Sequence, residues 1–299
     1  MRVVVTGGTG FLGRALLPVL QRNGHEVAVV SRDPSLATLP PGVRAVAWND
    51  LPGVVDGAGG VVNLAGETIA QRWTGAAKSR IVGSRAEAAA RVGEALRAAR
   101  AKPAVLLNAS AVGFYGDRGD EELDESSPAG RGFLAETTVA WEEAARRAAP
   151  EGVRLVLART GIVLGEEGGA LAKMLLPFRL GVGGPLGSGR QWMPWIHRDD
   201  LVSLLVAALG DSRYEGPVNA VAPAPVTMRE FAATLGKVLR RPAFAPAPAF
   251  AIRAAMGEMA SLVLEGQKAV PAKAARLGFR FRFERLEPAL ADLLAPPPG

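Results

Sequence analysis

The stretch RVVVTGGTGFLG, residues 2–13, decides the fold of this chain. It begins as a short apolar run typical of a buried strand, passes through glycines and then opens a helical pattern. Gly7, Gly10 and Gly13 recur at intervals of three residues. Gly7 permits a tight turn, Gly10 lets backbone approach a pyrophosphate, and Gly13 lets the helix pack closely on the strand. The stretch predicts a dinucleotide-binding loop, and the alternative is a turn with a structural role only.

The helix that follows the glycines contributes to the same site. Its first amide groups, those of Phe11 and Leu12 among them, have no carbonyl partner within the helix. Such amides point toward the phosphates of a nucleotide lying over the loop. Pro18 falls inside the helical pattern, and we expect a kink there because proline removes a backbone hydrogen bond.

Apolar strands and helices alternate along the first half of the chain. Strands are expected there at 27–30, 43–48, 60–63, 104–108 and 153–158, and helices at 11–22, 76–100 and 131–148. A further helix is expected near the end of the chain, at 252–264. Strands that are apolar throughout and alternate with helices predict an α/β fold, a Rossmann-type doubly wound parallel sheet covered on both faces.

The amino-acid composition changes after residue 164, where the sequence becomes rich in glycine. We therefore place a Rossmann domain at 1–165 and 196–220. A smaller, mostly helical substrate domain is expected at 166–195 and 221–299. The closing LAPPPG, residues 294–299, is expected to fray.

The composition excludes several classes of site. The chain has no cysteine and two histidines, so disulfides, thiol nucleophiles and multi-histidine metal sites are ruled out, and no metal is expected. The net charge of +6 comes from scattered arginines, which favours an anionic small ligand over nucleic acid. No apolar run is long enough to cross a membrane, and the first residues do not resemble a signal peptide. We expect a cytoplasmic protein.

The end of the second expected strand indicates which cofactor the loop binds. A site that prefers NAD usually places a carboxylate here to hold the ribose hydroxyls. This chain has Ser31 and Arg32 instead, and both can bind the 2′-phosphate of NADP. Asp33 follows and is expected to point away. The sequence thus favours NADP over NAD, and the alternative is an exposed arginine without a ligand.

Four motifs carry a resemblance to a known superfamily: TGGTGFLG, NLAG at 63–66, NASAVGFYG at 108–116 and PWIHRDDL at 194–201. Together they resemble the extended short-chain dehydrogenases/reductases, which include nucleotide-sugar epimerases and dehydratases. PFRLGVGGPLGSGRQWMPWIH and LEGQKAVP resemble the "epimerase family protein" branch, which has its own C-terminal domain. Members of this branch are often labelled NAD-dependent epimerase/dehydratase-like or cell-division inhibitor. The resemblance implies an oxidoreductase or epimerase-like activity.

The resemblance also implies roles for particular residues. Ser110 matches the active-site hydroxyl at the end of a central strand, where it would hydrogen-bond the substrate oxygen. The alternative is a serine that bonds only backbone. The implied cofactor-lining residues, beyond the glycine loop and Ser31 with Arg32, are Asn49, Asp50, Asn63, Ala65, Gly66, Glu67, Arg72, Thr160, Gly161 and Ile162.

The sequence departs from this family at one place. Typical members carry a Tyr-x-x-x-Lys pair on the helix after the serine, and the stretch 131–148 contains neither residue. Tyr115 is the first candidate for a replacement proton donor, with water, Glu136 or His197 as alternatives. The other tyrosine, Tyr214, lies in a late loop and is expected at the surface.

The substrate pocket is expected between the glycine-rich segment and the C-terminal domain. Arg179 and Arg190 could hold an anionic, nucleotide-linked substrate, with Trp192, Met193 and His197 beside it. The aromatic residues could instead only close the domain interface. Two hypotheses stay open: an NADP-dependent oxidoreductase or epimerase-like enzyme using Ser110, and an NADP-binding regulatory or interaction protein without turnover. The oligomeric state cannot be inferred from the sequence.

Overall fold

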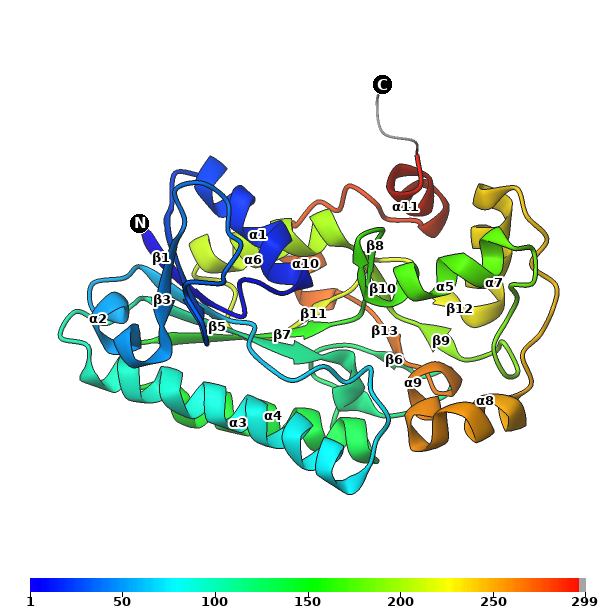
Figure 1. Ribbon diagram of the computed structural model, residues 1–299, viewed down its shortest axis with the longest axis horizontal. Coiled ribbons are helices and arrows are strands. Elements are labelled where there is room, and N and C mark those ends of the chain that lie inside the picture. The colour runs from blue at the N-terminus through cyan, green and yellow to red at the C-terminus, as the bar shows by residue number, and fades with distance from the viewer. Residues whose placement is uncertain (296–299) are drawn as a thin grey trace.

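The computed structural model, shown in Figure 1, describes residues 1–295, and residues 296–299 lie outside the described part. The frayed end expected at LAPPPG falls mostly on those last residues. The described chain builds a seven-stranded sheet with the order β11-β7-β5-β4-β1-β2-β3, in which all neighbours are parallel. Its strands are β1 (Arg2–Thr6), β2 (Glu26–Ser31), β3 (Arg44–Ala47), β4 (Gly60–Asn63), β5 (Val105–Ala111), β7 (Arg154–Thr160) and β11 (Gly216–Ala220). The predicted doubly wound Rossmann fold is confirmed.

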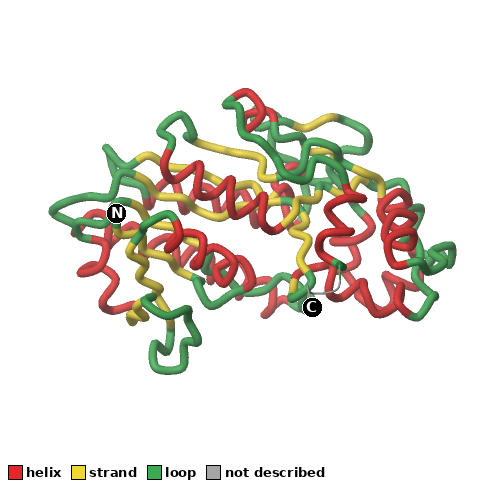
Figure 2. The backbone as a smooth tube through the Cα atoms, turned by 90° about the horizontal axis from the view of Figure 1, so that it is seen from above, coloured by secondary structure: helices red, strands yellow, loops and turns green. Residues whose placement is uncertain are grey.

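Helices cover both faces of the sheet, as Figures 1 and 2 show. On one face lie α1 (Phe11–Arg22) and α6 (Arg198–Gly210), which contribute Leu16, Leu20 and Leu201 to a core with the strands. On the other face lie α2 (Leu51–Val55), α3 (Gly75–Ala98) and α4 (Phe133–Ala148). Both sides of each central strand are therefore buried, which explains why the strands are apolar throughout. None of the helices within residues 1–295 is long and apolar enough to cross a bilayer.

A second, smaller core lies beyond the carboxyl ends of the strands. It gathers Leu171, Phe231 and Leu290 from three helices around Trp195, which is fully buried. These helices are α5 (Gly169–Arg179), α7 (Met228–Leu239) and α11 (Leu286–Leu293). The short strands beside them are β8 (Ile162–Gly165), β9 (Trp192–Met193), β10 (Trp195–His197) and β12 (Val226–Thr227).

The remaining elements are short. They are β6 (Glu122–Leu123), β13 (Lys268–Ala269), α8 (Ala249–Met256), α9 (Ser261–Leu264), α10 (Ala272–Arg276) and the 3-10 turns η1 (Trp48–Asp50), η2 (Val112–Tyr115) and η3 (Gly257–Ala260). Strand β13 pairs with β6 in parallel. Ala274 of α10, with Phe279 and Phe281 after it, packs into the core that α1 and α6 share with the sheet. Part of the tail assigned to the second domain thus lies against the first.

Two local expectations need correction. The helix expected at 252–264 is divided into α8, η3 and α9, because Gly257 adopts a φ of 60° that ends α8. Helix α1 includes Pro18, and the kink expected there stays a prediction. Tyr214 is buried rather than exposed, because it packs into the core below α6.

Candidate functional site

The glycine loop is shaped so tightly that side chains would not fit. Gly7 has a φ of +70°, and a Cβ there would lie 2.7 Å from the carbonyl carbon of Leu64 and 2.9 Å from the amide nitrogen of Ala65. A Cβ on Gly13 would lie 2.4 Å from the carbonyl oxygen of Gly8. The loop therefore lies directly against the chain that leaves β4, and α1 lies directly against the loop. This is the close packing that a dinucleotide-binding turn requires.

The amino end of α1 is open. Its N-cap residue is Gly10, no side chain caps the helix, and its first turn holds no acidic residue. Among residues 1–295, no group accepts a hydrogen bond from the amides of Phe11, Leu12 or Gly13. Unpaired amides at a helix start attract phosphate oxygens, so the residues present fit the pyrophosphate of a dinucleotide.

A row of buried polar side chains fixes the ends of three neighbouring strands. The Thr6 hydroxyl donates to Oδ1 of Asn63 at 2.6 Å, and Nδ2 of Asn63 donates to Oδ1 of Asn108 at 2.6 Å. All three residues are fully buried. The amide of Ala65 donates to Asn63 Oδ1 at 3.4 Å. The side chain of Asn63, predicted to line the cofactor, is thus engaged with Thr6, Asn108 and the loop after β4.

The end of β2 leaves Arg32 available. Asp33 turns toward its own loop, because its carboxylate accepts from the hydroxyl of Ser35 at 2.6 Å and from its amide at 3.1 Å. These hydrogen bonds, the hydroxyl first, hold the pKa of Asp33 below its usual value. Ser31 Oγ donates to the Asp33 carbonyl at 3.0 Å. Arg32 is exposed and forms no ion pair within residues 1–295.

Four further residues expected to line the cofactor, two of them at its adenine, are exposed or only half-buried. Asn49 and Asp50 are exposed, and Oδ1 of Asn49 accepts from Arg91 at 3.2 Å. The amide of Glu67 donates to the Ser84 hydroxyl at 2.9 Å, which ties the loop after β4 to α3. Arg72 is exposed. These positions line the carboxyl edge of the sheet without a common contact.

Ser110 belongs to a buried ion-pair network. Its hydroxyl donates to Oε1 of Glu142 at 2.7 Å, and Glu142 is fully buried inside α4. Arg159 of β7 binds the same carboxylate through two hydrogen bonds, of 2.7 and 3.0 Å, and Arg146 adds a third contact of 2.9 Å. The sequence analysis missed Glu142 and Arg159. An arginine inside the apolar run LVLART was the signal, since a strand arginine of this kind requires a buried partner.

Tyr115 is the other end of this network. Its hydroxyl accepts from Arg159 at 3.0 Å and donates to Oδ1 of Asn219 at 2.6 Å. Burial raises the pKa of Tyr115, and the side chain is 0% exposed. Ser110 is 4% exposed. Both hydroxyls predicted to be catalytic are therefore committed to buried partners, and neither faces an open cleft.

Two residues of α4 border the turn that follows β5, and neither has a carboxylate, an imidazole or an amine. A Cβ on Gly113 would lie 3.4 Å from Cβ of Leu134 and 3.7 Å from Oγ1 of Thr138. These two α4 residues therefore border the turn directly after β5. The Thr138 hydroxyl donates to the Leu134 carbonyl at 2.7 Å. Glu136, an alternative donor, is exposed on the first turn of α4.

Backbone contacts with Pro194 hold the segment at the end of β7 in place. A Cβ on Gly161 would lie 2.3 Å from the Pro194 carbonyl oxygen, which also accepts from the amide of Ile162 at 2.6 Å. The Thr160 hydroxyl donates to the Ala158 carbonyl at 3.2 Å. Strands β7 and β8 are thereby joined to the start of β10, and the three residues 160–162 are only half-buried.

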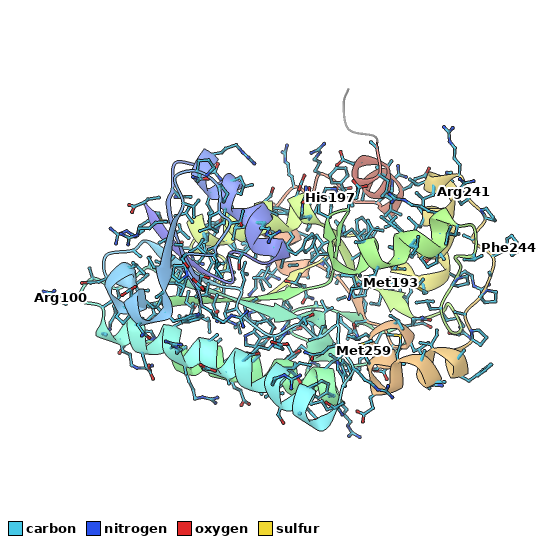
Figure 3. The ribbon with its side chains drawn as sticks, viewed as in Figure 1. Arg100, Met193, His197, Arg241, Phe244 and Met259 are labelled. Atoms are coloured by element: carbon cyan, nitrogen blue, oxygen red, sulfur yellow. The ribbon has the colours of Figure 1, made fainter. Side chains whose placement is uncertain are left out.

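The predicted substrate residues do not converge on one pocket. Arg179 and Arg190 are exposed, and Arg179 pairs with Glu166 at 3.5 Å. Trp192 donates its indole N–H to Asp120 at 2.8 Å. Met193 is buried in the second core, and Figure 3 shows it well apart from His197. Within residues 1–295, Arg179 and Arg190 share no hydrogen-bond or ion-pair partner, and their role at a substrate stays a prediction.

His197 lies at the junction of the two cores rather than in an open pocket. Its Nδ1 accepts from the Asp199 amide at 3.1 Å and so caps α6. The ring stacks on Phe283 with centroids 4.0 Å apart, and Nε2 lies 3.4 Å from Asp292. The side chain is 1% exposed. Asp200 accepts from the amides of residues 282 and 283, which holds the tail beside the ring.

His197 is expected to make stability depend on pH. Burial lowers its pKa against the opposing effect of Asp199, Asp292 and Asp200. Below about 6.5 the unfolded chain then binds a proton that the folded chain does not, so stability falls as the pH decreases. Unfolding measured by urea at several pH values should show a shallower decline in His197→Asn, which keeps a capping oxygen. Equal slopes for the wild type and His197→Asn would contradict the assignment.

Two known protein families match segments of this chain. The family described as "NAD dependent epimerase/dehydratase family" matches residues 3–220, and "Domain of unknown function (DUF1731)" matches residues 247–293. Epimerase family protein SDR39U1 of Mus musculus is 42% identical over 301 residues, covering 99% of this chain and 100% of that protein. Epimerase family protein YfhF of Bacillus subtilis is 39% identical over 304 residues, covering 99% and 98%.

Solved structures agree with these matches. The crystal structure of human epimerase family protein SDR39U1 (isoform2) with NADPH superimposes with a TM-score of 0.91 at 40% identity, covering 98% of this chain and 99% of that one. MoeE5 in complex with UDP-glucose and NAD gives a TM-score of 0.76 at 22% identity, covering 98% and 97%, a likeness of fold alone. The chain therefore belongs to the NAD dependent epimerase/dehydratase family and also contains a DUF1731 domain.

Proposed function

We propose that the protein binds NADP(H) at the carboxyl ends of β1 and β2 and transfers hydride between the nicotinamide and a small carbonyl or alcohol compound. The open amino end of α1 against the glycine loop carries this proposal. Arg32, without a partner at the end of β2, supports NADP over NAD. The human relative was crystallised with NADPH, whereas MoeE5 was crystallised with NAD.

Different residues of the chain bind different parts of the cofactor. The α1 amides hold the pyrophosphate, and Arg32 with Ser31 holds the 2′-phosphate. The bound cofactor supplies the hydride. The Ser110 hydroxyl is hydrogen-bonded to Glu142 and helps to keep Glu142 and Arg159 in place beneath the site. Because this hydroxyl is engaged there, water at the turn bordered by Leu134 and Thr138 exchanges the proton with the substrate instead. The absence of a positioned acid or base costs about 10²–10⁴ in rate, and slow turnover is expected.

A second candidate is an NADP(H)-binding regulatory or interaction protein without turnover. The burial of the Ser110 and Tyr115 hydroxyls favours it, because neither can reach a substrate in this arrangement. In both candidates the ligand is a small molecule, and we keep a cytoplasmic location as part of the proposal. For a nucleotide-linked substrate, Arg179 and Arg190 remain the proposed anion-binding residues.

One experiment separates the two candidates. The protein is titrated with NADPH and then mixed with a panel of carbonyl compounds and nucleotide sugars while nicotinamide absorbance is followed. Oxidation of NADPH by any member supports the enzyme. Protection against heat by NADPH without oxidation across the panel supports the second candidate, and no protection at all overturns both.

Arg32→Gln is expected to weaken NADPH binding about ten- to a hundredfold, because one charge-assisted hydrogen bond contributes about 1.5–3 kcal/mol. Binding of NADH should change little, since it has no 2′-phosphate. Calorimetric titration with both nucleotides measures the two affinities. Arg44→Gln is the matched control, because Arg44 is an exposed arginine at the opposite end of the neighbouring strand β3. Equal losses for NADPH and NADH in Arg32→Gln would refute the role.

A further inference from the structure

Most of the exposed large apolar side chains gather at one end of the molecule. Among residues 1–295, seven such side chains are exposed, and five of them belong to α5, the turn after it and the segment from α7 to α8. These five, here called the end patch, are each between 64% and 80% exposed: Leu176, Leu180, Val182, Phe244 and Phe250. Exposed apolar groups that gather instead of lying singly indicate a surface that another body covers.

Two segments that are far apart in the sequence lie side by side in the end patch. The turn after α5 and the segment that leaves α7 run in parallel and are bridged between Leu186 and Ala247. A Cβ on Gly184 would lie 2.1 Å from the carbonyl oxygen of Ala245. Small residues fill this contact, so the large side chains of the end patch remain outside it.

The end patch is surrounded by cations. Residues 236–256 contain four Lys or Arg and no Asp or Glu, and residues 168–189 contain two Lys or Arg and again no acidic residue. Within residues 1–295, Arg240 and Arg241 form no ion pair, and neither does the exposed Lys173 of α5. An apolar surface with cations beside it suits a partner that is negatively charged where it borders an apolar interior.

A second copy of the chain does not fit this charge. In a symmetric dimer, the end patch of one copy would meet the same patch of the other. Arg240 and Arg241 of both copies would then face one another, and residues 236–256 hold no carboxylate to offset the repulsion. An anionic lipid surface fits both properties, since its headgroups attract arginine and its acyl chains receive leucine and phenylalanine side chains.

The place of the end patch also suits a flat partner. Figure 3 shows Arg241 and Phe244 at one end of the longest axis of the molecule, and Arg100 at the other. The apolar side chains project from the surface, since even the least exposed of them, Val182, is 64% exposed. A planar surface can therefore contact them without displacing another element of the fold.

We propose that the end patch is a docking surface for membranes that contain anionic phospholipids. The side chains of Leu180, Val182 and Phe244 enter the headgroup layer, and Arg240 and Arg241 bind the phosphate and carboxylate groups of the lipids. The glycine loop and Arg32, proposed above to bind the cofactor, belong to neither segment of the patch. Membrane docking is thus independent of the proposed function.

Sedimentation with vesicles tests this docking. The wild type should sediment with vesicles made of equal parts phosphatidylcholine and phosphatidylserine, stay in solution with pure phosphatidylcholine, and be released by added salt. Phe244→Ser and Leu180→Ser should each weaken binding about ten- to a hundredfold, the effect of burying one such side chain less. Leu36→Ser is the matched control, because Leu36 is 79% exposed but lies in the loop after β2. It should bind the vesicles as the wild type does.

A pair of double variants separates the position of the charges from their number. Arg240→Gln with Arg241→Gln should weaken binding to the anionic vesicles about thirtyfold. Arg97→Gln with Arg100→Gln removes the same charge from two exposed arginines near the opposite end of the molecule, and should bind as the wild type does. Thermal unfolding near the wild-type midpoint shows that each variant is folded.

Three results would overturn the proposal. The first is a wild type that does not sediment with the anionic vesicles, or that sediments equally with pure phosphatidylcholine. The second is an equal loss in the two double variants, which would show that net charge alone attracts the protein. The third is a wild type that ignores the vesicles but binds an acidic amphipathic peptide or self-associates, in a way that Phe244→Ser abolishes. The end patch would then be a protein-binding surface. None of these results bears on the binding of NADPH, which is titrated separately.

Discussion

Replacing Glu142 with alanine is expected to lower the free energy of unfolding by about 3–5 kcal/mol, the usual result of removing one partner of a buried ion pair. Arg159 is 3% exposed and would lose both of its short carboxylate contacts. Ser110 would lose the acceptor of its hydroxyl. The cation would then lie in the protein interior facing only the Tyr115 hydroxyl and aromatic rings.

Urea unfolding of Glu142→Ala beside Glu143→Ala measures this effect. Glu143 is the next residue of α4, but its side chain is 56% exposed and lies 3.8 Å from Arg147. An exposed pair of this kind contributes about 0–1 kcal/mol, so Glu143→Ala should unfold near the wild-type midpoint. Comparable losses in both variants would show that helix propensity, not the buried network, determines the change.

Gly7→Ala is expected to reduce NADPH affinity about a hundredfold, equivalent to roughly one or two charge-assisted hydrogen bonds. The new Cβ would lie within 3 Å of the backbone of Leu64 and Ala65. The loop must then move away from β4 and carry its own backbone out of the position that receives phosphate. An L-residue at a φ of +70° also costs about 1–2 kcal/mol of stability.

The control for Gly7→Ala separates backbone strain from the clash. Gly24 has a φ of +74°, and nothing lies within 4 Å of a Cβ placed there. Gly24→Ala should therefore lose a similar amount of stability and keep its affinity for NADPH. Thermal unfolding and fluorescence titration report the two quantities independently. If Gly7→Ala binds NADPH as tightly as Gly24→Ala does, the loop does not hold the nucleotide.

The sheet could be predicted from the sequence because its signals are local. Each strand is apolar throughout, and the glycines of residues 7–13 serve a turn that only their spacing allows. The broken helix at 252–264 could not be predicted, since an isolated glycine such as Gly257 is compatible with a helix until its φ is known. Tyr214 was misplaced because a loop residue can be drawn into a core by the helix beside it.

The site was harder to predict than the fold, since it depends on which polar groups meet. Ser110 has the right position along the chain, yet the side to which its hydroxyl points depends on Glu142 and Arg159, which lie 32 and 17 residues apart from their partners in sequence. Neither the α4 segment nor the β7 segment alone predicts that the Glu142 carboxylate pairs with Arg159. Arg159 is buried with its carboxylate partner, whereas Arg179 and Arg190 are exposed.

The return of the tail to the first core has a consequence for how the protein can be divided. Asn219 of β11 donates to the Val270 carbonyl, and Glu125 accepts from the amides of Asn219 and Lys273. A fragment cut at residue 220, where the match to the larger family ends, would lack Ala274 and expose the apolar floor that it covers. The last segment therefore ties the tail to the sheet, and we expect a fragment of residues 1–220 to be less stable than the whole chain.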